Sequence, residues 1–257
     1  MGKNITSFED YKNEYAKSIN NPETFWEEKA NNFTWQKKWE NVLSWDFSKP
    51  EIKWFEGGKL NITENCLDRH LETRGEQTAI KWIANNPYEK SRSLSYKELY
   101  TEVCKFANVL KNNGAKKGDR ICLYMPMVPE LAITVLACAR IGAIHSVVFA
   151  GFSAKSLSDR INDATCNILI TADGGFRGAK ITPLKDISDE AMQSTPSIEK
   201  CIVFKRTKSE ITMKNGRDIW WHDEMQKVKA DCPIEIMDSE DPLFILYTSG
   251  STGKPKG

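Results

Sequence analysis

The segment Asp241-Pro-Leu-Phe-Ile-Leu-Tyr-Thr-Ser-Gly-Ser-Thr-Gly-Lys-Pro-Lys-Gly257 joins a short apolar run to a loop rich in glycine and hydroxyl side chains. Residues 243–247 have the length and the aromatic and β-branched content of a buried strand. Directly after them the chain becomes small, polar and cationic. A strand that ends in such a loop is typical of phosphate sites, because glycine lets backbone N–H groups approach the anion, and hydroxyls and lysine add donors.

The spacing within this loop differs from the G-x-x-x-x-G-K-[ST] loop of the P-loop NTPases. Thr248 occupies the position of the first glycine, and Pro255 follows Lys254. Proline also disfavours a helical conformation of the residue before it, so a helix is not expected to run through Lys254. A glycine–serine linker is the other interpretation, but such linkers do not usually follow a five-residue apolar strand. The segment therefore indicates a phosphate loop of a different class.

The loop closely resembles the Y-T-S-G-[ST]-T-G-x-P-K-G motif of the AMP-forming adenylating enzymes, which include acyl-CoA synthetases, luciferases and peptide-synthetase adenylation domains. Ten residues within 247–257 match the motif at its spacing. The resemblance implies that Lys254 acts catalytically, by neutralising charge that builds on the leaving pyrophosphate. It implies ATP-phosphate binding by Thr248, Ser249, Gly250, Ser251, Thr252, Gly253 and Lys254.

The composition argues against several classes of partner. Lys plus Arg total 36 and Asp plus Glu total 35, so the net charge is +1 and predicts neither nucleic-acid nor membrane binding. The seven cysteines are scattered without C-x-x-C spacing, which predicts reduced, buried thiols instead of a disulfide framework or a zinc site. The N-terminus lacks the apolar region of a signal peptide. These features predict a cytoplasmic protein, and we expect no metal ligand in this chain.

Strands and helices alternate from about residue 66 onward. The expected strands are residues 79–84, 120–125, 143–149, 167–171, 201–204 and 243–247. The expected helices are residues 96–110, 129–141, 153–161, 183–192 and 220–229. Ser95 and Glu98 form a capping box before the first of these helices, and Gly114 follows its end. Such alternation predicts an α/β fold with parallel βαβ units in a layered sheet.

Residues 1–65 differ from this pattern, because they hold five of the eight tryptophans. Phe8, Tyr11, Tyr15 and Ile19 recur at helical spacing, and a second helix is expected to begin near Pro22. We expect a helix-and-loop extension without clear strands, followed by a separate α/β domain over residues 66–257.

Two further loops follow expected strands, at residues 149–153 and 172–180. Ligands of parallel sheets bind at the carboxyl ends of the strands, so these loops and the phosphate loop predict one functional face. Arg177 and Lys180 lie three residues apart among small residues. Their spacing alone is equally consistent with a phosphate site and with a solvated loop.

A wider resemblance favours the phosphate site. Residues 144–185, the tryptophan-rich beginning and Trp220-Trp-His-Asp223 are similar to one subgroup of the family, the acetyl-CoA synthetases, so the resemblance spans essentially the whole chain. It implies that Arg177, Gly178, Ala179 and Lys180 bind the 3′-phosphate end of coenzyme A. It places Phe149, Ala150 and Gly151 beside the CoA adenine. The family usually has Phe-Gly-Gly there, so Ala150 is a departure.

The resemblance implies an acetate–CoA ligase, which uses ATP and CoA and forms acetyl-CoA through an acetyl-adenylate. The family's adenine, acetate and Mg²⁺ ligands follow the phosphate loop, so Mg²⁺ ligands are expected outside this chain. We expect an incomplete N-terminal adenylation domain that does not run the whole reaction alone and can self-associate through its incomplete sheet. Two alternatives remain: a synthetase for propionate or another short-chain acid, and a non-catalytic module that binds CoA or nucleotide.

Overall fold

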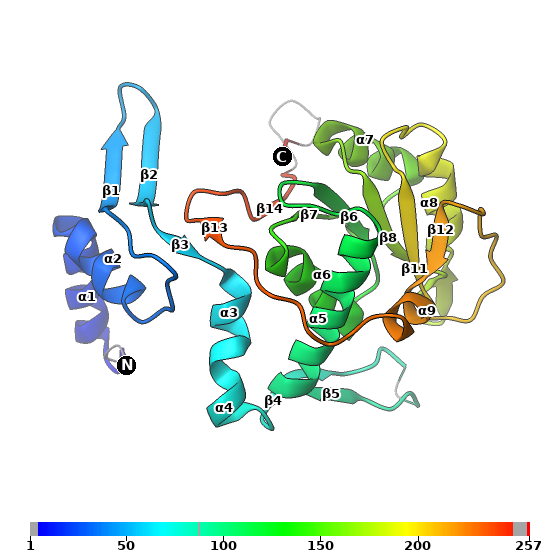
Figure 1. The fold of residues 1–257 in the computed structure, drawn as a ribbon, viewed down its shortest axis with the longest axis horizontal. Helices are drawn as coiled ribbons and strands as arrows, with labels where there is room; N and C mark the ends of the chain where they lie inside the picture. The colour runs from blue at the N-terminus through cyan, green and yellow to red at the C-terminus, as the bar shows by residue number, and fades with distance from the viewer. Residues whose placement is uncertain (1–4, 87, 249–255) are drawn as a thin grey trace. The chain divides into compact units, whose positions relative to one another are not determined.

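A computed structural model of the chain describes residues 5–86, 88–248 and 256–257. Its residues group into two compact units (Figure 1). The first unit comprises Met1–Arg69 together with Ile236–Asp241, and the second comprises His70–Glu235 together with Pro242–Gly257. The first unit thus extends four residues beyond the expected boundary at residue 65 and takes in a segment that is distant in sequence.

The first unit combines helices with a β-hairpin. The two expected helices are present as α1 (Phe8–Asn20) and α2 (Pro22–Ala30). The expectation that this region lacks strands is wrong, because β1 (Asn41–Asp46) and β2 (Glu51–Glu56) pair in antiparallel register. A second antiparallel pair joins β3 (Lys59–Leu60) to β13 (Met237–Asp238), and α3 (Ile62–Cys66) follows β3.

Four of the five tryptophans of this unit, Trp26, Trp35, Trp39 and Trp54, form an aromatic cluster with Phe55. Trp35 packs edge-on against Trp39, with 4.9 Å between ring centroids, and Phe55 lies 5.1 Å from the Trp39 ring. A Cβ atom at Gly58 would lie 2.7 Å from the Trp35 ring, so this position accommodates only glycine without a shift. Packing within the unit therefore explains these four tryptophans, whereas Trp45 is exposed.

The second unit is built on a parallel sheet. Among the described residues, its strands lie in the order β12-β11-β8-β6-β7-β14, and every neighbouring pair is parallel. The strands are β6 (Arg120–Tyr124), β7 (Ile144–Val147), β8 (Ile168–Ala172), β11 (Lys200–Phe204), β12 (Asp218–Trp220) and β14 (Phe244–Ile245). All five residues of β8 are buried, as expected for a strand covered on both faces. The expected parallel α/β architecture is confirmed.

Helices cover both faces of this sheet (Figure 1). On one face α5 (Tyr96–Asn112) packs against α6 (Pro129–Arg140) and α9 (Trp221–Gln226). On the other face α7 (Ala154–Ala164) packs against α8 (Leu184–Met192). The capping box of Ser95 and Glu98 is confirmed at the start of α5. A core that includes Tyr124, Leu157 and Leu169 lies under α7 and α8.

Several expected elements differ in extent or type. The strand expected at 143–149 ends at Val147, the one expected at 243–247 is reduced to two residues, and the helix expected to reach 229 ends at Gln226. The loop expected at 172–180 contains an antiparallel hairpin of β9 (Gly175–Arg177) and β10 (Lys180–Thr182). A further antiparallel pair, β4 (Thr78–Trp82) with β5 (Arg92–Ser95), precedes α5, after the short helices η1 (Asp68–His70) and α4 (Leu71–Arg74).

All seven cysteines are free thiols, six of them buried and one, Cys66, exposed. Cys66 is therefore the exception to the expected burial. Within the described parts of the chain, no helix is long and apolar enough to cross a membrane.

The burial of His145 predicts that the stability of the folded chain depends on pH. It lies buried in β7 between Ile121 of β6 and Phe244 of β14, and its Nδ1 has no hydrogen-bond partner among the described residues. Burial lowers the pKa of His145 to about 4 from 6.5, so the unfolded chain binds this proton more tightly. We expect the free energy of unfolding to fall by about 3 kcal/mol through this group as pH drops from 6.5 to 4, and to be unaffected by it above 6.5.

Urea denaturation of the wild type and of His145→Gln between pH 4 and 8 measures this contribution, because glutamine does not titrate. The difference in unfolding free energy between the two proteins should change only below pH 6.5. If the unfolding free energies of the two proteins differed by a constant amount from pH 4 to 8, the titration of His145 would not contribute to stability.

Candidate nucleotide-binding site

The carboxyl ends of the parallel strands bring several loops to one edge of the sheet. The chain passes from β6 to β7 on one side of β6, and then to β8 on the other side. Such a reversal of strand order opens a crevice at the carboxyl ends, where ligands of α/β sheets bind. The segments after β6, β7, β8 and β14 all leave the sheet at this edge. The common edge is therefore confirmed for the loops after β7 and β8, whereas most of the third loop, the phosphate loop, lies outside the described residues.

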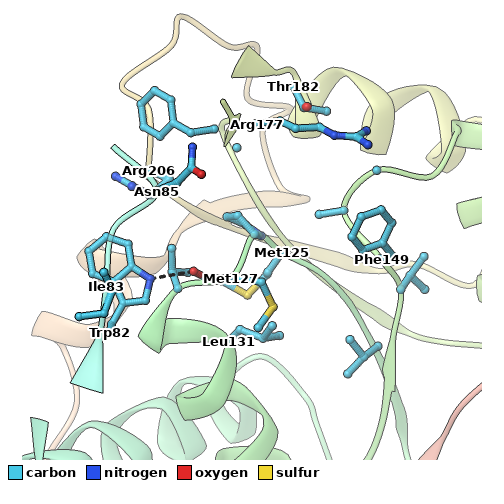
Figure 2. A pocket seen from close by; sticks show the side chains of 18 residues that line it. Trp82, Ile83, Asn85, Met125, Met127, Leu131, Phe149, Arg177, Thr182 and Arg206 are labelled. Atoms are coloured by element: carbon cyan, nitrogen blue, oxygen red, sulfur yellow. Dashed lines mark hydrogen bonds between the residues drawn. The ribbon is translucent and has the colours of Figure 1, made fainter. Parts of the chain in front are cut away.

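A cavity of about 600 Å³ lies at this crevice. Figure 2 shows Arg177 and Phe149 on one side of the cavity and Trp82 and Arg206 on the opposite side, with Met125, Met127 and Leu131 between them. The lining is mostly apolar with a few polar groups, as is usual for small-molecule sites. Its residues come from five segments: 82–85, 125–131, 147–151, 175–182 and Arg206.

The loop after β7 presents an aromatic ring at the rim of the cavity. The Phe149 side chain is 62% exposed, and its ring lies edge-on to that of Phe152 with centroids 5.6 Å apart. A Cβ atom at Gly151 would come within 2.4 Å of the Phe149 ring, so the ring lies directly over this glycine. The Tyr124 hydroxyl donates a 2.7 Å hydrogen bond to the Phe152 carbonyl and fixes the loop to β6. Phe149, Ala150 and Gly151 all line the cavity and form a surface that can stack against a planar ring.

The β9–β10 hairpin carries the two cations singled out in the sequence. Its turn consists of Gly178 and Ala179, and Gly178 has φ of +60°, as the first turn residue of a tight hairpin requires. This turn places Arg177 directly opposite Lys180 on the paired strands. Like charges at opposite positions destabilise a hairpin. The pairing is therefore unfavourable unless an anion lies between or beside the two cations.

Arg177 and Lys180 have no compensating carboxylate. Within the described residues, which include every Asp and Glu of the chain, neither side chain forms an ion pair or hydrogen bond, and both are exposed. Arg177 lines the cavity, whereas Lys180 lies on the hairpin outside the lining residues. The structure thus brings Arg177 together with residues 149–151, and leaves Lys180 beside them with its charge free.

The structure describes only the flanks of the phosphate loop. Ser249, Gly250, Ser251, Thr252, Gly253 and Lys254 lie outside the described residues. Thr248 and Lys256, on either side of them, exchange backbone hydrogen bonds of 2.9 and 3.2 Å. Before the loop, the Tyr247 hydroxyl donates a 2.7 Å hydrogen bond to Asp163 of α7, and Arg160 lies over the Tyr247 ring. Both contacts fix the entrance of the loop to α7.

Sequence reasoning missed several cavity residues. Arg206 follows β11 by two residues, so the rule of strand ends could have found it. Trp82 and Asn85 come from the antiparallel β4–β5 region, where that rule gives no signal. No group of three or more His, Cys, Asp or Glu side chains that could hold a metal ion occurs among the residues described.

Comparison with protein families gives two adjoining matches. The model of the family described as AMP-binding enzyme matches residues 67–257. The model described as acetyl-coenzyme A synthetase N-terminus matches residues 11–66. Together they cover all of the chain except its first ten residues.

Curated relatives match over nearly the whole chain. An acetyl-coenzyme A synthetase of Bdellovibrio bacteriovorus is 56% identical over 96% of this chain and 38% of the relative. One of Magnetococcus marinus is 54% identical over 97% of this chain and 39% of the relative. The structure of acetoacetyl-CoA synthetase from Streptomyces lividans superimposes with a TM-score of 0.84 at 26% identity, over 93% of this chain and 36% of that one. The chain therefore spans less than two fifths of the length of these relatives.

Proposed function

The chain belongs to the AMP-binding enzyme family, and we propose that it supplies the N-terminal part of an acetate–CoA ligase. Such an enzyme converts ATP, acetate and CoA to acetyl-CoA, AMP and diphosphate through an acetyl-adenylate. The proposal is supported by the names of the curated relatives, which are acetyl-coenzyme A synthetases at 54% and 56% identity. These names favour acetate over propionate and over a role restricted to binding. In this proposal residues 1–65 are the N-terminal extension and residues 66–257 the first part of the adenylation domain.

The phosphate loop holds the triphosphate of ATP in this proposal. The acetate carboxylate is ionised at neutral pH, so its attack on the α-phosphorus needs no general base. The contribution of the protein is to position the phosphates and to neutralise charge on the departing diphosphate. We assign this role to Thr248 and to Ser249, Gly250, Ser251, Thr252, Gly253 and Lys254, on the match of the loop to the family motif. The fixed flanks, Thr248 and Lys256, are compatible with it.

The cavity beside the β9–β10 hairpin is the CoA nucleotide site in this proposal. The observation that carries the assignment is the opposed, uncompensated pair of Arg177 and Lys180. A phosphate that accepts hydrogen bonds from the guanidinium and ammonium groups would relieve their repulsion. The Gly178–Ala179 turn sets the spacing between the two cations. Phe149, Ala150 and Gly151 supply the surface for the adenine ring.

Mg²⁺ accompanies ATP in reactions of this kind, where it neutralises phosphate charge. We assign the Mg²⁺ ligands outside this chain on the resemblance of the phosphate loop to the family motif, and derive no step through the ion.

Arg177→Ala tests the CoA site. The charge-assisted hydrogen bonds from Arg177 to the 3′-phosphate should contribute about 1.5–3 kcal/mol, so the variant should bind CoA at least roughly tenfold more weakly. Binding of 3′-dephospho-CoA should change far less, because the group that Arg177 contacts is absent. Isothermal titration of both ligands measures the two dissociation constants.

Lys229→Ala is a matched control, because it removes one exposed positive charge that does not line the cavity. It should leave both constants unchanged. If Arg177→Ala weakened the binding of CoA and of 3′-dephospho-CoA by the same factor, the assignment of Arg177 to the 3′-phosphate would be contradicted.

A further inference from the structure

The two arginines that line the cavity have different surroundings (Figure 2). Arg177 is exposed and has no partner in the described chain. The Arg206 side chain is only 14% exposed, and its Nη2 lies 2.6 Å from Oε2 of Glu89. The charge of Arg206 is therefore compensated by a carboxylate before any ligand binds, whereas that of Arg177 is not.

The Arg206 guanidinium also lies between two aromatic rings. Its central carbon is 4.8 Å from the ring centroid of Phe176 and 5.3 Å from that of Trp82. Arginine suits this arrangement because its planar group stacks on aromatic faces while its edge donates hydrogen bonds. Protein groups thus contact the plane of the guanidinium and one of its nitrogens, Nη2.

These contacts join three segments that are distant in sequence. Trp82 and Glu89 belong to the β4–β5 hairpin and its connection, Phe176 belongs to β9, and Arg206 follows β11. Asn85, in the connection between β4 and β5, adds a second, weak link to the β9–β10 hairpin. Its side-chain amide donates a 3.4 Å hydrogen bond to the Gly178 carbonyl. The backbone of Arg206 is held as well, because its N–H donates a 2.7 Å hydrogen bond to the buried Asp173 carboxylate.

We propose that Arg206 is a positioning residue, which holds the β9–β10 hairpin against the β4–β5 region so that Arg177 and Lys180 present their charges at the cavity. This inference rests on the proposed CoA site for its functional consequence, but its structural part does not depend on it. Phe176 and Arg177 are adjacent in β9, so clamping the Phe176 ring fixes the strand that carries Arg177. The hairpin needs such a clamp because its opposed cations repel each other.

The proposal predicts a different binding signature for each arginine. Loss of Arg206 should lower the affinity for CoA and for 3′-dephospho-CoA by the same factor, about five- to tenfold. The factor is the same because either ligand would have to order the loosened hairpin when it binds. Loss of Arg177 should instead reduce the preference for CoA over 3′-dephospho-CoA.

Hydrogen–deuterium exchange of the ligand-free chain tests the clamp directly. In Arg206→Met, amides of residues 175–182 should exchange roughly tenfold faster, and amides of β8 and β6 should be unchanged. Arg206→Lys keeps the pairing with Glu89 but loses the planar stacking, so it should restore only part of the protection. Glu89→Gln, which removes the charge of the half-buried partner but keeps its size, should give an intermediate increase in exchange. Lys90→Met is the matched control, because it removes a neighbouring exposed cation with no ion pair in the described chain.

Unchanged hairpin exchange in both Arg206→Met and Glu89→Gln would overturn the proposal. Faster hairpin exchange with unaltered CoA affinity would also overturn it, because the clamp would then not position the binding residues. If the wild-type chain showed no preference for CoA over 3′-dephospho-CoA, the proposed CoA site would fail, and the exchange experiment would still decide whether Arg206 clamps the hairpin.

Discussion

Lys185→Met is expected to lower the free energy of unfolding by about 3–5 kcal/mol, because it removes the buried member of an ion-pair network and leaves two carboxylates, Asp189 and Asp218, with Arg217 as their one cation in the described chain. The Lys185 side chain is completely buried at the start of α8. Its ammonium lies 2.6 Å from Asp189 and 2.9 Å from the equally buried Asp218, and donates to the Thr212 carbonyl at 2.9 Å. Urea denaturation followed by circular dichroism measures the loss.

The carboxylates around Lys185 explain why the loss should be large. Burial by itself raises the pKa of Asp218, but hydrogen bonds from Arg217, the Lys214 backbone and Lys185 outweigh it and hold the pKa below its usual value. Asp218 is therefore ionised in the folded protein at neutral pH. Its contribution to stability is present above the pKa of an unfolded aspartate, near 4, and is lost as the pH falls below that value. Methionine at position 185 would leave this charge with Arg217 as its remaining cation.

Lys155→Met is a matched control on the neighbouring helix α7. Lys155 also pairs with an aspartate four residues later, Asp159, but both side chains are largely exposed. Exposed pairs of this type contribute about 0.3–0.5 kcal/mol, so the control should change the unfolding free energy by no more than that. Equal losses in the two variants would show that burial of Lys185 does not determine its contribution.

The alternation of elements in the second unit could be predicted because local signals and global fold agree there. Ser95 and Glu98 fix the start of α5, and the apolar runs that became β6 and β8 are too short for helices. The ends of the strands could be predicted less accurately than their presence. The expected strand at 143–149 stops at Val147 because the next residues turn into the cavity loop, where Phe149 leaves the sheet.

The hairpins were missed because their pairing depends on contacts between segments. In β1 and β2 the apolar residues include three tryptophans or phenylalanines, which also fit a helix or loop by composition. In β9 and β10 each strand has three residues, too few to show an alternating pattern. Only the positive φ of Gly178 in a two-residue turn makes the segment a hairpin.

In the candidate site, too, some features could be predicted from the sequence and others could not. The position of residues 149–151 and Arg177 at one edge follows from the rule of strand ends, and it could be predicted before the fold was known. The roles of Arg177 and Arg206 could not be distinguished from sequence, since both follow strands of the same sheet. Glu89, Trp82 and Phe176 determine the difference, and all three lie outside the six-stranded sheet.

Asp173→Ala is expected to lower the free energy of unfolding by about 3 kcal/mol, although it removes only one small side chain. The Asp173 carboxylate, 1% exposed at the end of β8, accepts hydrogen bonds from the backbone N–H groups of Gly174, Arg206 and Thr207 at 2.7–2.9 Å. Alanine would leave three donors without this acceptor, and an unsatisfied buried donor costs about 1–3 kcal/mol. Partial access of water to Arg206 and Thr207 places the expected loss at the lower end of the sum.

Two further variants separate this role from a general effect of charge. Asp173→Asn keeps one oxygen acceptor, so it should lose roughly half as much stability, whereas Asp231→Ala, at an exposed side chain without a hydrogen bond in the described chain, should lose almost none. The urea midpoint should therefore be lowest for Asp173→Ala, higher for Asp173→Asn and highest for Asp231→Ala, and this order follows from hydrogen bonding alone. If Asp173→Ala unfolded at the wild-type midpoint, the carboxylate would not be what fixes the segment after β11, and the backbone of Arg206 would have to be held by its side-chain contacts.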